Sequence, residues 1–359
     1  MLTRLRKLFA AGADAAPNVR APAPPRIAAP NDVAAGAGAP FPIAAHLRRE
    51  QGFPILDWAA AGAWLDTLEG AHTRAEAWTA IERAWLLHLR DALGAGFQLE
   101  ESSNCLLLSA LEGNVAKATL GYMERTRERV LRTLTGIAAA TPGSKDILIV
   151  FDNEDSYYRY VSHAYPEAGE FAGSGGMYIH HGCGHFVTVK RDLSAVEPVI
   201  AHEMTHACLA HLPIPAWLNE GLAVNTEQRL AGPQPSQYTP REMHAMHLAF
   251  WGRAEIQEFW SGASFLRTDD GNLLSYDLAR ILVAHAAGDW EVFRAFVLAA
   301  NMADGGAQAA AAHLGADLGE LVCALLGQVQ PSGWEPLPAT WKGAPESGAF
   351  SCRLHGAGT

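Results

Sequence analysis

A long, almost wholly apolar stretch lies in the middle of the chain. Between Pro198 and Leu212 its polar side chains are His202, Glu203, Thr205, His206 and His211. A helix formed by this stretch would be buried on nearly every side. Burying those polar side chains costs free energy unless each of them finds a partner, and a metal ion would be one such partner.

Shorter periodic segments before this stretch alternate between strand and helix patterns. They predict a strand at 104–111, a helix at 114–134, a strand at 146–151 and a helix at 154–165. Two more short strands, at 175–179 and 185–190, lead into the apolar helix across the turn-like sequence HHGCG. The predicted fold class is α+β, in which a small mixed β-sheet lobe with an edge strand next to the apolar helix is followed by an α-helical lobe. We expect Phe186 to Lys190 to form that edge strand.

The flanking regions complete the predicted domain organisation. Residues 1–42 are rich in Ala, Pro and Gly and predict a disordered leader, because they bury too little side chain to offset the entropy of ordering. Tryptophans at near-helical spacing predict an N-terminal helical region at 43–103. We then expect an α/β lobe at 104–230, a helical lobe at 231–330 and a loose C-terminal tail at 331–359.

Composition and charge narrow the possible partners. A chain of 359 residues that is 49% hydrophobic can bury a sizeable core. The net charge of -11, without a basic stripe, predicts no nucleic-acid partner, and no segment is apolar for long enough to span a membrane. Five scattered cysteines and an N-terminal apolar run broken by Gly12 and Asp14 favour a cytoplasmic location, with export as the alternative. The oligomeric state is not indicated.

His202 and His206 are four residues apart, in the spacing HExxH. On a helix their side chains rise from one face with Cβ atoms about 5–6 Å apart, which suits one Zn²⁺ held by two imidazoles. Glu203 lies beside them. A metal-bound water loses its proton far more easily than bulk water, and a neighbouring carboxylate can accept that proton and later pass it to a leaving amine.

A third ligand follows in the sequence PAWLNEGLAV. Glu220 comes 14 residues after His206, at the start of a second predicted helix. Pro213 and Pro215 end the first helix and allow the chain to reverse. Gly221 has no side chain, so we expect it to let these two helices approach closely enough to share an ion. We therefore predict one Zn²⁺ per chain, bound by His202, His206 and Glu220 at about 2.0–2.2 Å, with water in the fourth position.

HEMTH followed by WLNEGLA resembles the gluzincin zinc metallopeptidases, and most of all their peptidase MA-like group. The resemblance covers roughly residues 146–327. It implies that His202, His206 and Glu220 bind zinc, that Glu203 is the general base, and that Tyr276 in LLSYDLARILVAH stabilises the oxyanion. The family often has a second carboxylate four residues after the third ligand. Here that residue is Val224, which leaves Glu227 as a substitute.

The resemblance also bears on specificity. The family's aminopeptidases grip the free N-terminus of the substrate with the glutamate of a GxMEN strand, whereas this chain has GGMYI, with Tyr178 at that position. We therefore expect a peptidase that cleaves internal bonds of peptide or protein substrates, with the edge strand binding the substrate backbone by strand addition. An aminopeptidase remains the alternative, because Glu167 or Glu170 could supply the missing charge.

Three other interpretations stay open from the sequence. The cluster HHGCGH offers a rival metal site at His180, His181, Cys183 and His185, although its glycines equally suit a hairpin turn. The apolar helix could hold no metal, its polar residues bonding to one another. Finally, the protein could keep zinc without catalysis, as an inactive binding or scaffold protein, although zinc binding alone needs no residue such as Glu203. Tyr276 could likewise be a buried aromatic residue whose hydroxyl is hydrogen-bonded.

Overall fold

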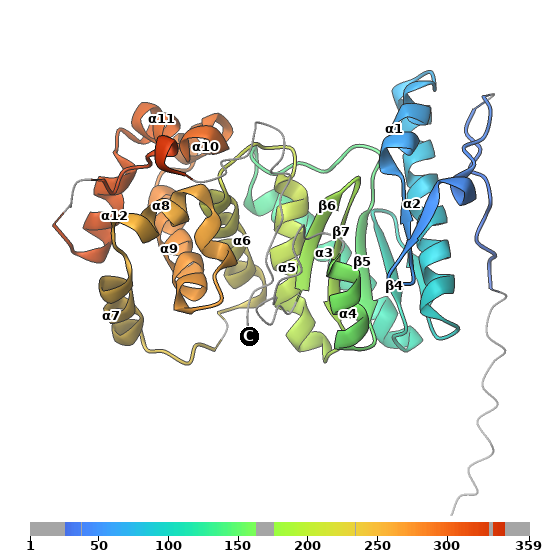
Figure 1. Ribbon diagram of the computed structural model, residues 1–359, viewed down its shortest axis with the longest axis horizontal. Coiled ribbons are helices and arrows are strands. Elements are labelled where there is room, and N and C mark those ends of the chain that lie inside the picture. The colour runs from blue at the N-terminus through green and yellow to red at the C-terminus, as the bar shows by residue number, and fades with distance from the viewer. Residues whose placement is uncertain (1–25, 37, 163–175, 234, 330–332, 342–359) are drawn as a thin grey trace, which may run out of the picture.

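The structure is a computed structural model that describes residues 26–36, 38–162, 176–233, 235–329 and 333–341, apart from the side chains of His180 and His181 (Figure 1). Helices and a mixed five-stranded sheet confirm the α+β class. The sheet has the order β3-β4-β5-β7-β6. Its strands are β3 (Gln98–Glu101), β4 (Cys105–Ser109), β5 (Asp146–Phe151), β6 (Gly176–His181) and β7 (Cys183–Val189).

The middle of the sheet is parallel, because β5 pairs in parallel with both β4 and β7, while β3 and β6 are antiparallel edge strands. β5 is apolar at nearly every position because both of its faces are buried. Ile147 and Ile149 face one core, whereas Leu148 and Val150 face the other. The sheet is therefore the central layer of a three-layer sandwich.

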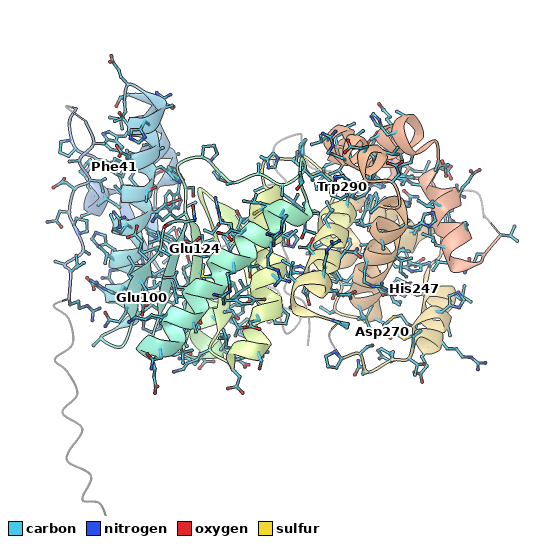
Figure 2. All side chains as sticks on the ribbon, turned by 180° about the vertical axis from the view of Figure 1, so that it is seen from behind. Phe41, Glu100, Glu124, His247, Asp270 and Trp290 are labelled. Carbon is cyan, nitrogen blue, oxygen red and sulfur yellow. The ribbon has the colours of Figure 1, made fainter. Side chains whose placement is uncertain are left out.

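Helices cover the two faces of the sheet (Figure 1). α1 (Trp58–Asp66), α2 (Ala71–Leu93) and α4 (Glu154–Val161) pack on the face of Ile147. α3 (Gly113–Thr133) and α5 (Leu193–Leu209) pack on the opposite face. Seen from behind, α3 crosses the sheet and carries Glu124 (Figure 2). The apolar stretch noted in the sequence is thus a helix, α5, which lies between the sheet and the second lobe.

The structure corrects the prediction of the edge strand. Phe186 to Val189 belong to β7, which is paired on both sides, with β5 and with β6. The described edge is β6, because the tight turn at Gly182, whose φ is +72°, folds β6 outward from β7. The backbone groups of β7 already form ladder hydrogen bonds, so strand addition along 186–190 is excluded.

The N-terminal region contains more structure than we predicted. Residues 26–36 and 38–42, expected to belong to a disordered leader, pack on the helices that follow. Val33 and Phe41 are buried, and Arg90 of α2 donates a hydrogen bond to the Ile27 carbonyl at 2.6 Å. Residues 1–25 lie outside the described chain. A hairpin of β1 (Leu47–Glu50) and β2 (Phe53–Leu56) then precedes the two expected helices.

The second lobe is helical, as expected, and the structure gives its elements as α6 (Ala216–Ala231), α7 (Pro240–Phe250), α8 (Arg253–Ser261), α9 (Asp270–Ala286), α10 (Trp290–Ala299), α11 (Ala307–Ala309) and α12 (Leu318–Leu326). The start of the expected loose tail packs on α8: Trp334 is buried, and its carbonyl accepts a hydrogen bond from Trp260 at 2.8 Å. Residues 342–359 lie outside the described chain.

No single helix in the described ranges is long and apolar enough to cross a membrane. By length and composition alone, one bent helix pair, Ala307–Leu314 with Leu318–Leu326, passes the same test at an angle of 78°. The four described cysteines, Cys105, Cys183, Cys208 and Cys323, are buried and free.

Candidate metal centre

Two helices bring the three predicted ligands together. His202 and His206 lie one turn apart on α5, and Glu220 lies in the first turns of α6. Between the helices the chain reverses, with Pro215 as the N-cap of α6. All three side chains are buried, and one ligand atom of each lies within 4.8 Å of the others. The structure therefore forms a buried His-His-Glu group that can hold a metal ion.

The distances from Glu220 to the two histidines fit adjacent corners of a tetrahedron around one ion. Glu220 Oε2 lies 3.3 Å from His202 Nε2 and 3.4 Å from His206 Nε2. Two ligand atoms at adjacent corners of a tetrahedron, each about 2.0–2.1 Å from the ion, are about 3.3–3.4 Å apart. None of the three atoms makes a hydrogen bond within the described chain. Buried polar atoms without hydrogen bonds are costly, so a cation between them would remove that cost.

The second ring nitrogen of each histidine, Nδ1, contacts a polar side chain of α6. His202 Nδ1 lies 3.1 Å from Glu227 Oε2, and His206 Nδ1 lies 3.0 Å from Asn219 Oδ1. Both contacts favour the tautomer with hydrogen on Nδ1, which leaves Nε2 as the metal-binding atom. Glu227 thus contacts a predicted ligand, His202, as expected of the second carboxylate. Our sequence reasoning missed Asn219, although it immediately precedes Glu220 in the NEG motif.

The electrostatics of the site favour positive charge. Burial lowers the pKa of His202, but its contacts with Glu220 and Glu227 outweigh burial and raise that pKa well above its ordinary value. Burial raises the pKa of Glu220, yet the adjacent His206 and His202 lower it to about 2. The surroundings therefore stabilise a positive charge at the point where the three ligand atoms meet.

Glu203 lies on α5 between the two histidines and is fully buried. Burial raises its pKa to about 8, while the neighbouring His202 and a backbone hydrogen bond from Tyr178 lower it. A cation at the ligand atoms would lower this pKa further, because an opposite charge nearby favours the carboxylate. Glu203 thus lies on the same helix turn as His202, where a bound cation would favour its ionised form.

Tyr276 belongs to α9 of the helical lobe and reaches the same region. Its ring centroid lies 6.3 Å from that of His202 and 5.2 Å from that of Phe265. The next residue, Asp277, accepts a hydrogen bond from His247 of α7 at 3.0 Å, which ties α9 to α7. His247 is seen in the helical lobe in Figure 2. The structure therefore places the Tyr276 ring next to that of His202, and its role as an oxyanion donor stays a prediction.

Gly221 lies at the contact between α6 and α9, whereas we expected it to allow close approach of α6 to α5. A Cβ at this position would lie 2.5 Å from the carbonyl oxygen of Ala279 and 2.5 Å from a Val283 methyl group. The glycine therefore permits close approach of α6 to α9, rather than of α6 to α5. This contact joins the helix that carries Glu220 to the helix that carries Tyr276.

The rival cluster does not form a metal site in the described chain. His185 lies on the opposite face of the sheet, where Nε2 is 2.8 Å from the Tyr160 hydroxyl and Nδ1 is 2.9 Å from the Cys183 carbonyl. Both ring nitrogens are thus already used. The side chains of His180 and His181 lie outside the described part, and so do Glu167 and Glu170.

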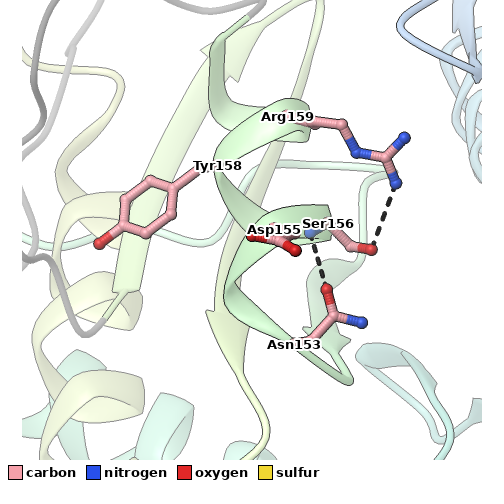
Figure 3. A pocket seen from close by; sticks show the side chains of 5 residues that line it. All are labelled: Asn153, Asp155, Ser156, Tyr158 and Arg159. Carbon is pink, nitrogen blue, oxygen red and sulfur yellow. Dashed lines mark hydrogen bonds between the residues drawn. The ribbon is translucent and has the colours of Figure 1, made fainter.

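Two hollows lie away from the ligand atoms. One, of about 630 Å³, opens over the first turns of α4 and is lined by Asn153, Asp155, Ser156, Tyr158 and Arg159 (Figure 3). Asn153 caps the start of α4, because its Oδ1 accepts a hydrogen bond from the backbone N–H of Ser156 at 2.9 Å. This hollow contains none of the predicted site residues. The second hollow, of about 180 Å³, lies beside α5 and includes Tyr178.

No protein-family model matches the chain, and no curated protein sequence matches it. The resemblance to gluzincins therefore stays an expectation from the HExxH and NEG residues.

Proposed function

We propose that the protein is a zinc-dependent peptidase. The proposal depends chiefly on one observation: the ligand atoms of His202, His206 and Glu220 gather within 4.8 Å of one another, and Glu203 is next to His202 on α5. Two imidazoles and one carboxylate form a donor set that zinc favours. A closed structural zinc site has four protein ligands, whereas the described residues supply three here, which leaves a position for water.

Each residue then has a distinct task. Zinc, when bound, makes a water molecule acidic and polarises the carbonyl group of the substrate. Glu203 accepts the proton of the attacking water and delivers it to the nitrogen of the leaving amine. The Tyr276 hydroxyl donates a hydrogen bond to the carbonyl oxygen as negative charge develops on it. Glu227 and Asn219 keep the histidine rings oriented.

We favour cleavage of internal peptide bonds. An aminopeptidase needs a fixed negative charge to hold the free amine of its substrate, and Tyr178 supplies none. The Tyr178 side chain is buried among residues of the α5 face of the sheet. Its hydroxyl packs over Gly184, where an added Cβ would lie 2.2 Å from it. Because strand addition along β7 is excluded, the substrate must bind through other surfaces.

One observation favours a second candidate, a zinc-containing protein without catalysis. His202, Glu203 and His206 have no exposed surface and Glu220 has 1%, so a substrate needs a rearrangement before it can reach them. A buried metal that only stabilises the fold would need no such access. The buried carboxylate of Glu203 favours the peptidase, because metal binding alone leaves the cost of burying it without a benefit.

Digestion of a peptide library by the zinc-loaded protein separates these functions. Unblocked and N-acetylated peptides are incubated with the wild type and with Glu203→Gln, and the cut sites are mapped by mass spectrometry. We expect cleavage inside both kinds of peptide, and a loss of about 100-fold or more in the variant. Release of single residues from unblocked peptides alone would indicate an aminopeptidase. If the zinc-loaded wild type cuts nothing, the second candidate is correct.

A further inference from the structure

The hollow beside α5 lies farther along the helix that carries the proposed general base. Ala207 and Ala210 form part of its wall, and on a helix these positions share a face with Glu203. At 1.5 Å of rise per residue they lie about 6 and 10 Å along the helix from Glu203. An extended peptide advances about 3.3 Å per residue. The hollow thus lies two to three residues from a peptide bond held at Glu203.

Charged side chains also line the hollow. Arg127 of α3 and Asp146 at the start of β5 form an ion pair, with Arg127 Nε 2.9 Å from Asp146 Oδ2. Both side chains are mostly buried, at 17% and 19% exposed. Burial raises the pKa of Asp146 to about 6 although the Arg127 charge lowers it, so the pair does not fully offset the burial of its carboxylate.

The remaining charged group in the wall is already engaged. Lys145 Nζ lies 2.7 Å from Glu101 Oε1 and 2.6 Å from the Ser102 carbonyl. Arg127, in contrast, has Asp146 as its only ion-pair partner among the described residues, and it is bound there through Nε. Its two terminal nitrogens keep donors in the fork geometry that matches a carboxylate.

We propose that this hollow is a subsite for an acidic side chain of the substrate, which Arg127 binds two to three residues from the cleaved bond. The proposal rests on the proposed peptidase function and adds a substrate class to it. Ala207 and Ala210 leave room for the incoming side chain, and Asp146 holds the guanidinium in place through Nε. Asp146 acts as a positioning residue.

Equilibrium binding to the zinc-loaded Glu203→Gln protein tests the subsite without catalysis. The probes are fluorescently labelled ten-residue peptides of alanine and serine, N-acetylated and C-amidated, with one central Glu, Gln or Lys, measured by fluorescence anisotropy. We expect the Glu peptide to bind about 10- to 100-fold more tightly than the Gln peptide, as for a charged hydrogen-bonding pair. Adding Arg127→Gln should remove that preference, and Arg127→Lys should retain only part of it.

Two further variants serve as a matched control and as a second test of the hollow. Arg125→Gln removes an exposed arginine from the same helix and should leave the preference unchanged. Ala210→Leu fills the hollow from the other wall and should weaken binding of the Glu peptide while Arg127 stays intact. Zinc content is measured for each variant, so that a misfolded protein is recognised.

The outcomes separate the two proposals. Equal affinity for the Glu and Gln peptides, in a protein whose wild type binds zinc and cuts peptides, overturns the subsite and leaves the peptidase in place. If the Lys peptide binds most tightly, Asp146 is the binding group and the proposal is wrong. If no peptide binds and none is cut, both proposals fail.

Discussion

Oε2 of Glu227 lies 3.1 Å from Nδ1 of His202, while Nε2 of the same ring lies 3.3 Å from Glu220. The imidazole of His202 thus contacts the Glu227 carboxylate on one side and the carboxylate of the predicted ligand Glu220 on the other. The outer contact fixes the ring orientation and increases the basicity of the metal-binding nitrogen. Glu227 is expected to contribute to metal affinity without touching the ion.

Replacement of Glu227 by alanine is expected to weaken zinc binding about 10- to 100-fold. Glu227→Gln should lose less, because its amide oxygen can still accept the hydrogen bond from Nδ1. Competition with a chromophoric chelator measures both affinities. Glu320→Ala, which removes an exposed glutamate on α12, serves as the control and should keep the wild-type affinity. Equal affinities for Glu227→Ala and Glu320→Ala would show that the outer contact is unimportant.

Substitution of Gly221 by alanine is expected to destabilise the fold by about 1–3 kcal/mol, because the added methyl group overlaps the Ala279 carbonyl and Val283. Gly62→Ala is a matched control, since Gly62 also lies within a helix but has no atom within 4 Å of an added Cβ. That change should stabilise the protein by about 0.5–1 kcal/mol. Urea unfolding at constant zinc concentration compares the two, and a stabilising Gly221→Ala would refute the close α6–α9 contact.

Glu82 predicts a pH dependence of stability. Burial raises its pKa to about 7, although hydrogen bonds from Ser144 and the Lys145 backbone lower it. The folded state therefore holds this proton more tightly than the unfolded state, in which the carboxyl keeps its ordinary pKa of 4.5. The stability that the protonated Glu82 carboxyl contributes to the fold is fully present below about pH 4.5, and it is lost as the pH rises through about 7.

Glu82→Gln removes this ionisation. Its amide oxygen can still accept the hydrogen bond from the Lys145 backbone N–H, and its amide NH2 group can donate to the Ser144 hydroxyl. From pH 4.5 to pH 8, the stability of the variant relative to the wild type should rise by about 2–3 kcal/mol. Other titrating groups are common to both proteins and cancel in the comparison. Urea titrations at the two pH values measure the difference. Parallel pH dependences of the two proteins would mean that Glu82 does not stay protonated in the fold.

The ligands could be predicted because their arrangement is local. HExxH places two histidines on one helix face, and the two prolines and the NEG sequence return Glu220 to them within one helix reversal. Asn219 was not predicted, since an amide that orients a histidine leaves no characteristic spacing. The wall that combines Arg127 with Ala210 joins α3 to α5, and no local pattern indicates that contact.

The edge strand and the leader were mispredicted for a similar reason. Both strands of the hairpin around Gly182 are apolar, and their order in the sheet depends on pairing with β5, which precedes them by more than 20 residues. Residues 26–42 have a composition typical of disorder, yet Val33 and Phe41 are buried in a core cluster to which α1 and α2 also contribute. Such long-range contacts override local composition.

The most direct test of the proposed zinc site is the zinc content of the purified protein, measured by elemental analysis after dialysis against zinc-free buffer. We predict one zinc per chain in the wild type and in Glu203→Gln, whose substituted residue is not a ligand. His206→Ala should contain none, and circular dichroism checks that this variant remains folded. An unchanged zinc content in folded His206→Ala, or a wild type that binds no zinc when zinc is supplied, would contradict the central claim.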